Sequence, residues 1–119
     1  MAKPRFLCDA DTPRGLIQAL GQLEPGLDVV RVGDPGAPPQ NIQDPDLLIA
    51  VEAMGRVLVS RDRSTMPVHL TDHFVSGLHT AGVILLRNGF TIGQYAQSVV
   101  NQWITTAADE WVDRTIYLP

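Results

Sequence analysis

The stretch that decides the fold is Gly55-Arg56-Val57-Leu58-Val59-Ser60-Arg61-Asp62-Arg63. Its centre, residues 56–60, is apolar and rich in β-branched side chains, which is typical of a strand in a sheet. Gly55 ends the segment before it, and the charged residues from Arg61 onwards end the strand itself. Residues 56–60 therefore predict one strand, and its neighbours are to be found elsewhere in the chain.

Apolar runs and helical periodicities alternate along the rest of the chain. Further strands are predicted at 5–8, 27–32 and 82–86, with a short final strand at 115–118. Helices are predicted from Pro13 to Leu23, from Pro45 to Met54, over 67–79 and over 92–107. Glycines and prolines separate these elements, and residues 33–39 form an irregular surface loop.

The alternation of strands and helices predicts a single α/β domain over residues 1–119. We expect a three-layer α/β/α sandwich with a mostly parallel sheet of about four to five strands and right-handed crossovers. The order of the strands does not follow from the sequence. If the strands at 5–8 and 56–60 are neighbours, the chain reverses direction between them, and the crevice beyond their carboxyl ends is the expected ligand site.

The composition excludes several classes of protein. Hydrophobic residues make up 45% of the chain and charged residues 18%, so we expect a globule that folds without a disulfide or a structural metal. The single cysteine, Cys8, lies in an apolar run and is expected to be buried in a reducing compartment. No apolar stretch is long enough for a membrane span and residues 1–5 do not begin a signal peptide, so we expect a cytoplasmic protein without membrane contact.

The charge balance limits the case for nucleic acid. A net charge of −4 gives no general attraction to a phosphate backbone, so any such contact has to be local. Three of the eight arginines, Arg56, Arg61 and Arg63, cluster around Asp62. This cluster is either the one basic feature that binds a phosphate or a set of solvated charges that caps the strand, and both interpretations stay open.

Four aspartates fall where the predicted elements would bring them to one crevice. Asp9 and Asp11 follow the first strand, Asp62 follows the third, and Asp44 begins the helix between the second and third. Carboxylates held about 4–6 Å apart repel one another unless a cation lies between them. Because hard divalent ions prefer carboxylate oxygens, we expect Mg²⁺ or Mn²⁺ on Asp9, Asp11, Asp44 and Asp62.

Each aspartate also has a purely structural interpretation. Asp44 before Pro45 is typical of a helix N-cap, and Asp11 or Thr12 can cap the helix that begins at Pro13. Asp62 can simply end its strand. Both interpretations stay open at this level, and the joint pattern adds weight to a shared site for a metal or a phosphate.

Several segments together resemble the small bacterial PIN-like proteins, and the resemblance covers most of the chain. The segments are Arg5-Phe6-Leu7-Cys8-Asp9-Ala10-Asp11, Gln43-Asp44-Pro45, residues 55–63, residues 82–86 and the closing Ile116-Tyr117-Leu118-Pro119. These proteins resemble the PIN ribonucleases, many of them toxins of toxin–antitoxin pairs, which hold Mg²⁺ or Mn²⁺ on aspartates at strand ends and hydrolyse RNA. The resemblance implies that Asp9, Asp44 and Asp62 are the catalytic acids and metal ligands.

The chain departs from the family pattern at two positions. The family often has Asp-Glu-Asn after the first strand, where this chain has Ala10 in the middle, so that Asp11 would replace the missing carboxylate. Many members carry a second aspartate two places after the equivalent of Asp62, where Ser64 stands here. We expect Arg61, Arg63 and Ser64 to contact the substrate phosphate.

Three functions remain open on the sequence alone. The first is a metal-dependent ribonuclease, or its toxin version, with RNA as substrate. The second is a catalytically degenerate protein of the same fold that binds an antitoxin-like or other protein partner, which the residues Ala10 and Ser64 favour. The third is a response-regulator receiver phosphorylated on Asp62, which needs a lysine after its last strand, whereas the only lysine here is Lys3.

The remaining chemistry-bearing residues give weaker signals. His69 and His73 are four positions apart on a predicted helix, as in zinc sites, but no glutamate follows His69. Ser60 lacks the glycine-flanked elbow of a nucleophilic serine. Trp103 and Trp111 are expected to pack in the core or in a subunit contact, and the apolar helix at 92–107 is compatible with a homo-oligomer.

Overall fold

A parallel sheet of five strands forms the centre of the molecule. The computed structural model describes residues 2–119. The sheet has the order β2-β1-β3-β4-β5, and every neighbouring pair is parallel. Its strands are Phe6–Cys8 (β1), Val29–Arg31 (β2), Val57–Ser60 (β3), Val83–Leu86 (β4) and Thr115–Leu118 (β5). The predicted α/β class is confirmed, and the sheet is wholly parallel.

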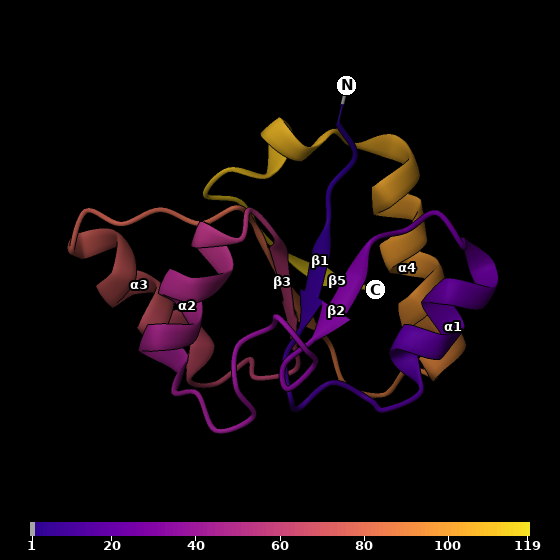
Figure 1. The fold of residues 1–119 in the computed structure, drawn as a ribbon, viewed down its shortest axis with the longest axis horizontal. Coiled ribbons are helices and arrows are strands. Elements are labelled where there is room, and N and C mark those ends of the chain that lie inside the picture. Colours follow the sequence, from indigo (N-terminus) through magenta and orange to yellow (C-terminus); the bar gives the residue numbers. More distant parts are fainter. Residues whose placement is uncertain (1) are drawn as a thin grey trace.

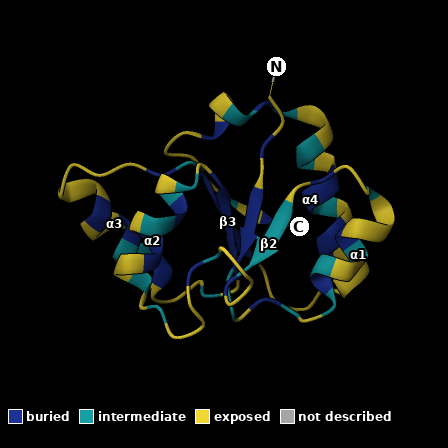
Figure 2. Cartoon of the chain, in the orientation of Figure 1, coloured by how far each residue is buried: buried dark blue, intermediate teal, exposed yellow. Residues whose placement is uncertain are grey.

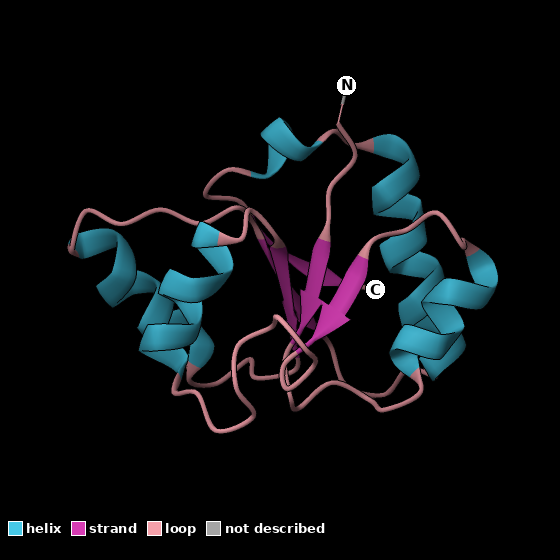
Figure 3. Cartoon of the chain, in the orientation of Figure 1, coloured by secondary structure: helices cyan, strands magenta, loops and turns pink. Residues whose placement is uncertain are grey.

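Helices cover both faces of this sheet, as expected (Figures 1 and 3). The helices α1, Leu16–Leu23, and α4, Ile92–Thr105, pack on each other and share one core cluster with Phe6 and Cys8 of β1. The helices α2, Asp44–Ala53, and α3, Met66–Val75, lie on the other face and share a second cluster with Leu7. Successive strand residues point to opposite faces, so each apolar strand supplies both cores.

The chain reverses direction around β1. It passes from β1 to β2 on one side and then returns to place β3 on the other side of β1. The first and third strands are therefore neighbours, with Cys8 of β1 level with Val59 of β3. In Figure 1 the strand arrows end at the bottom of the view, where the irregular loop between β2 and α2 also passes. Open parallel sheets bind ligands at such a reversal point.

Several predicted helix boundaries are wrong, including the end of the last helix at Thr105 rather than 107, and two of the errors concern candidate site residues. The first helix begins at Leu16 rather than Pro13, and its N-cap, Gly15, has no side-chain cap, so neither Asp11 nor Thr12 caps it. The N-cap of α2 is Gln43, and Asp44 lies inside the first turn. The helix α3 ends at Val75 because Gly77 follows with φ of 82°, a left-handed conformation that suits glycine.

The C-terminal segment closes the core with a tryptophan. Trp111 ends a short 3₁₀ helix, Ala108–Trp111 (η1), is fully buried, and donates its indole N–H to Thr106 Oγ1 at 2.8 Å. Its ring lies so close to Gly82, at φ of 115°, that a Cβ there would stand 2.8 Å from Trp111 Cε3. Trp103 is only half-buried, and Lys3 Nζ lies 5.3 Å from its ring. Trp111 thus packs in the core, one of the two predicted places.

Burial divides each helix into an inner and an outer face (Figure 2). The outer part of α3 stands apart because it exposes large apolar side chains, including Val68 at 60% and Val75 at 82%. None of the helices in residues 2–119 combines the length and the apolar composition that crossing a membrane demands.

Candidate functional site

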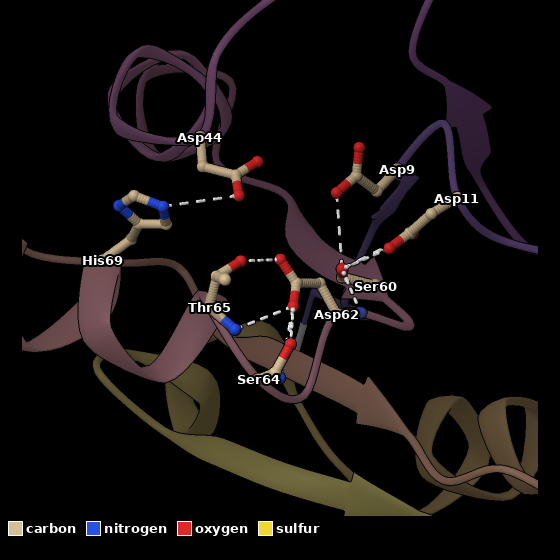
Figure 4. A network of polar contacts seen from close by, with 8 residues as sticks. All are labelled: Asp9, Asp11, Asp44, Ser60, Asp62, Ser64, Thr65 and His69. Atoms are coloured by element: carbon tan, nitrogen blue, oxygen red, sulfur yellow. Dashed lines mark hydrogen bonds and ion pairs between the residues drawn. The ribbon is translucent and has the colours of Figure 1, made fainter.

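The carboxyl ends of β1 and β3 bring the candidate aspartates together. The Asp9 N–H extends the pairing of these strands by donating to Val59 O at 2.8 Å, which fixes Asp9 directly beyond β1. Figure 4 shows the carboxylates of Asp9 and Asp11 on either side of the Ser60 hydroxyl, the Asp44 side chain across from Asp9, and the Asp62 carboxylate turned towards Ser64 and Thr65. The four aspartates predicted to share a crevice do lie at the same edge of the sheet.

Ser60, the last residue of β3, joins two of these carboxylates. It is fully buried, and its Oγ lies 3.3 Å from Asp9 Oδ2 and 3.4 Å from Asp11 Oδ2. The same oxygen accepts a hydrogen bond from the Asp62 N–H at 3.1 Å. Because a hydroxyl has one proton, it can donate to only one of the two carboxylates at a time. Ser60 therefore positions both acids without neutralising their charge.

Asp9 is the most perturbed acid of the site. It is half-buried, and its Oδ1 accepts a hydrogen bond from the Ala10 N–H at 2.7 Å. Burial, followed by the negative charges of Asp11 and Asp44, raises its pKa from the ordinary 3.8 to about 6, against the hydrogen bonds from Ala10 and Ser60, which lower it. No lysine or arginine of residues 2–119 forms an ion pair with Asp9 or Asp11. Such uncompensated charge is typical of a functional site.

Asp44 faces the site from α2 and is paired with a histidine. Its Oδ2 lies 3.7 Å from His69 Nε2 of α3, an ion pair whenever the imidazole is protonated. Partial burial raises the pKa of Asp44; His69 opposes the shift, and the charges of Asp62 and Asp11 support it. The side chain of Asp44 is thus available to the crevice, which the expected capping role would have prevented.

Asp62 is held by the turn that follows β3. Its Oδ1 accepts hydrogen bonds from the Thr65 N–H at 2.9 Å and from both the N–H and the hydroxyl of Ser64, and its Oδ2 accepts from the Thr65 hydroxyl. Burial acts to raise the pKa of Asp62, but these donors together hold it below its ordinary value. The predicted role of Asp62 in ending the strand is real, and its predicted role as a ligand stays a prediction.

A residue that the sequence analysis missed supports the loop after β1. Arg31, at the end of β2, donates to Ala10 O at 2.7 Å and to Thr12 O and Oγ1 at 3.1 and 2.9 Å. Thr12 in turn donates its hydroxyl to Asp9 O at 2.7 Å. These contacts hold the loop that carries Asp9 and Asp11. Nothing in the local sequence marks Arg31, because its partners, mostly backbone oxygens, belong to a turn far away in the chain.

Replacing Arg31 with methionine tests this support. The change leaves the carbonyl oxygens of half-buried Ala10 and buried Thr12 without their donor, so we expect a loss of about 2–3 kcal/mol in the free energy of unfolding. Amide hydrogen exchange should accelerate at residues 10–12 more than in the sheet. The control is Arg14→Met, an exposed arginine on the same connection. Equal effects of the two changes would show that Arg31 does not order the loop.

A depression lies beside the acids. It has a volume of about 400 Å³ and is lined by Arg61, Asp62, Arg63, Ser64 and Asn88. Arg61 and Arg63 are exposed, and neither forms an ion pair with an acid of residues 2–119. Asn88, which follows β4, is a second residue that the sequence analysis missed. The guanidinium groups and the amide together suit an anionic oxygen, such as that of a phosphate.

The aspartate oxygens are chemically suited to a hard divalent cation, but the carboxylates do not already lie at metal-binding distances from one another. Among residues 2–119 no three histidine, cysteine, aspartate or glutamate side chains are close enough to hold a metal ion as they stand. The donors are nevertheless oxygens only, and the repulsion that raises the pKa of Asp9 is what a cation would relieve. The residues present therefore fit Mg²⁺ or Mn²⁺ better than a softer metal.

The alternative sites that the sequence offered fare differently. His73 is buried, and its Nε2 bonds His79 O at 2.8 Å, which leaves His69 and His73 in separate contacts rather than a zinc pair. Burial raises the pKa of the Cys8 thiol to about 12, so it packs as the predicted buried residue. Lys3 Nζ donates to Ile104 O at 2.9 Å, and Lys3 precedes β1 at the amino end of the sheet. A receiver's lysine has no counterpart in this crevice.

No family model, curated protein or solved structure matches the chain. The resemblance to PIN-like proteins therefore stays a resemblance.

Proposed function

We propose that the protein is a metal-dependent ribonuclease of PIN-like type that hydrolyses RNA phosphodiesters. One observation carries the proposal: among residues 2–119, Asp9 and Asp11 converge on Ser60 without a basic partner, and the two exposed arginines beside them, Arg61 and Arg63, have no acidic partner. A fold gathers unneutralised acids next to unneutralised bases where a ligand brings both a cation and an anion. A divalent cation with a phosphodiester has that combination of charges.

Asp9, Asp11 and Asp44 would hold the cation. Asp62 would join them through Oδ2, which among the described residues accepts only the Thr65 hydroxyl and so has a lone pair left for a cation. Bound Mg²⁺ or Mn²⁺ supplies a water of lowered pKa for attack on phosphorus and polarises the phosphoryl oxygens. Ser60 keeps Asp9 and Asp11 aimed at the crevice, and Arg31 keeps their loop in place.

Arg61 and Arg63 would bind the phosphate. A guanidinium can form two parallel hydrogen bonds to phosphate oxygens, which fixes the phosphate in orientation as well as in position. The depression between these arginines and Asn88 adjoins Asp62, so a phosphate there lies beside the acids. Single-stranded RNA is the substrate that this open site accepts, because its backbone can enter without a duplex to distort.

The pH dependence of Mn²⁺ binding tests the proposed ligands. A cation binds only ionised Asp9, whose pKa is about 6, so binding displaces the proton that Asp9 carries at lower pH. We expect the affinity measured by titration calorimetry to be constant above about pH 7 and to fall by nearly tenfold for each pH unit below about 6. An affinity that does not change from about pH 5 to pH 7 would exclude Asp9 as a ligand.

A second function, a protein-binding module without catalysis, is favoured by two other observations. The acids are not spaced to hold a metal as they stand, and the outer face of α3 exposes Val68 and Val75. On this account no Mn²⁺ heat is seen at micromolar concentrations, and RNA is not cleaved. The same calorimetric titration therefore separates the two functions.

A further inference from the structure

A cavity of about 210 Å³ lies between α2 and α3, apart from the depression that the arginines line. Its apolar wall comes from Pro45 and Ile49 of α2 and from Leu78 beyond α3. Ile49 is 51% exposed and Leu78 38%, so the cavity opens to the surface. The residues that line it belong to α2, α3 and the segment after α3, and none belongs to the sheet.

Two links connect this cavity to the acids. His69 lines the cavity and also lies 3.7 Å from Asp44 Oδ2. Pro45, on the opposite wall, directly follows Asp44 in the first turn of α2. A group in the cavity therefore lies one side chain away from Asp44, one of the acids beside which the proposed function places the scissile phosphate.

The size and lining of the cavity fit a planar heterocycle. A closed cavity of about 150 Å³ is enough to hold a benzene ring, so this one has room for a six-membered ring with its substituents. The ring of His73, which lines the cavity, is fixed in orientation because its Nε2 donates to His79 O at 2.8 Å. The two imidazoles, His69 and His73, offer rings of the kind on which RNA bases stack.

The polar rim adds hydrogen-bonding groups to the apolar wall. Asp72 is exposed and lines the cavity, and its carboxylate can accept hydrogen bonds from an exocyclic amino group. The Ser76 hydroxyl already donates to Asp72 O at 2.9 Å, which leaves its oxygen as an acceptor. A mostly apolar pocket with a few polar groups on its rim suits an uncharged ring better than a phosphate.

We propose that this cavity binds the nucleobase adjacent to the scissile phosphate, so that a single RNA strand runs from the arginines past the acids into the space between α2 and α3. The proposal rests on the proposed function for its substrate class. It adds a base-binding subsite, with His69 as the residue shared by the subsite and the acidic site. Stacking and burial of one base stabilise binding independently of the metal.

The test uses binding and cleavage of a short single-stranded RNA. Ile49→Trp fills the cavity from its exposed edge, and Val68→Trp, on the outer face of the neighbouring helix, is the matched control. A second RNA lacks one base, at the strand position where removing a base weakens binding to the original protein most. Binding is measured by fluorescence anisotropy in EDTA, so that it does not depend on catalysis.

We expect Ile49→Trp and the missing base each to weaken binding by about tenfold to a hundredfold, and together by little more than either alone. Val68→Trp should bind both RNAs as the original protein does, and all variants should bind Mn²⁺ equally. Additive losses, or unchanged binding by Ile49→Trp, would overturn the base subsite even if RNA is cleaved. If the RNA affinities change as expected but no RNA is cleaved in Mn²⁺, the ribonuclease proposal would be overturned and the base subsite would stand. If the original protein binds no RNA and instead binds a protein partner through this face, both the ribonuclease and the base subsite would be overturned.

Discussion

Asp9→Asn is expected to reduce the rate of Mn²⁺-dependent cleavage of single-stranded RNA by at least about a thousandfold, while making the fold more stable. Asparagine keeps an oxygen for the Ala10 N–H and has nearly the same shape as aspartate. It removes the charge that binds the cation. It also removes the repulsion from Asp11 and Asp44 that the folded protein tolerates. Loss of activity with a gain in stability is the mark of a residue kept for function.

The sign of the stability change follows from the pKa of Asp9. The folded protein holds the Asp9 proton more tightly, at a pKa of about 6, than the unfolded chain does at 3.8. Stability is therefore lost as the pH rises from about 4 to about 6, and ionised Asp9 destabilises the fold at neutral pH. Asp9 is partly exposed, which reduces the effect, so we expect a gain of about 1–2 kcal/mol for Asp9→Asn at pH 7.

Urea denaturation at two pH values measures this gain. The difference between the variant and the original protein should be near zero at about pH 4 and positive at about pH 7. Asp28→Asn is the control of opposite sign, because Asp28 forms an ion pair with the buried Arg56 at 2.8 Å. That variant should lose stability and keep its activity. An Asp9→Asn protein that is less stable at pH 7, or that cleaves RNA fully, would contradict the proposed site.

Trp111→Ala is expected to cost about 3–5 kcal/mol in the free energy of unfolding, a large part of what a protein of this size has. Trp111 is fully buried, packs on Gly82 at the start of β4, and makes a hydrogen bond through its indole. Its removal leaves a cavity between η1 and the sheet that neighbouring side chains cannot fill. Leu118 of the edge strand β5, which shares a core cluster with Trp111, then loses a packing partner.

Trp103→Ala is the matched control for this prediction. Trp103 is half-buried beneath Lys3, so we expect its removal to cost about 1–2 kcal/mol. Both variants are compared by urea denaturation, with the elution volume recorded to monitor association. If both variants lost the same free energy of unfolding, or if the loss for Trp103→Ala depended on protein concentration, the main tryptophan contact would lie in a subunit interface rather than in the core.

The fold could be predicted because its signals are local. Runs such as residues 57–59 are apolar without alternation, since both faces of each inner strand are covered by helices. Helix periodicity identified all four helices. The errors lie at the ends: Gly77 ends α3 early, and the hydroxyl of Thr12 bonds Asp9 O instead of capping α1.

The site could be predicted only in part. The sequence identified the aspartates at the strand ends, because parallel strands bring their carboxyl ends to one edge. It could not identify Ser60, which looks like an ordinary strand residue until the Asp9 and Asp11 side chains are seen on its hydroxyl. Arg31 and Asn88 depend on contacts between segments far apart in the chain. Such contacts follow from the packing of the layers rather than from any local motif.

The central claim is that the acids at the ends of β1 and β3 bind a divalent cation, and crystals soaked in Mn²⁺ test it most directly. The account predicts an anomalous difference peak in contact with the carboxylates of Asp9 and Asp44, which disappears in crystals of Asp9→Asn. Soaked crystals without a peak between these carboxylates, or with the peak retained in Asp9→Asn, would contradict it.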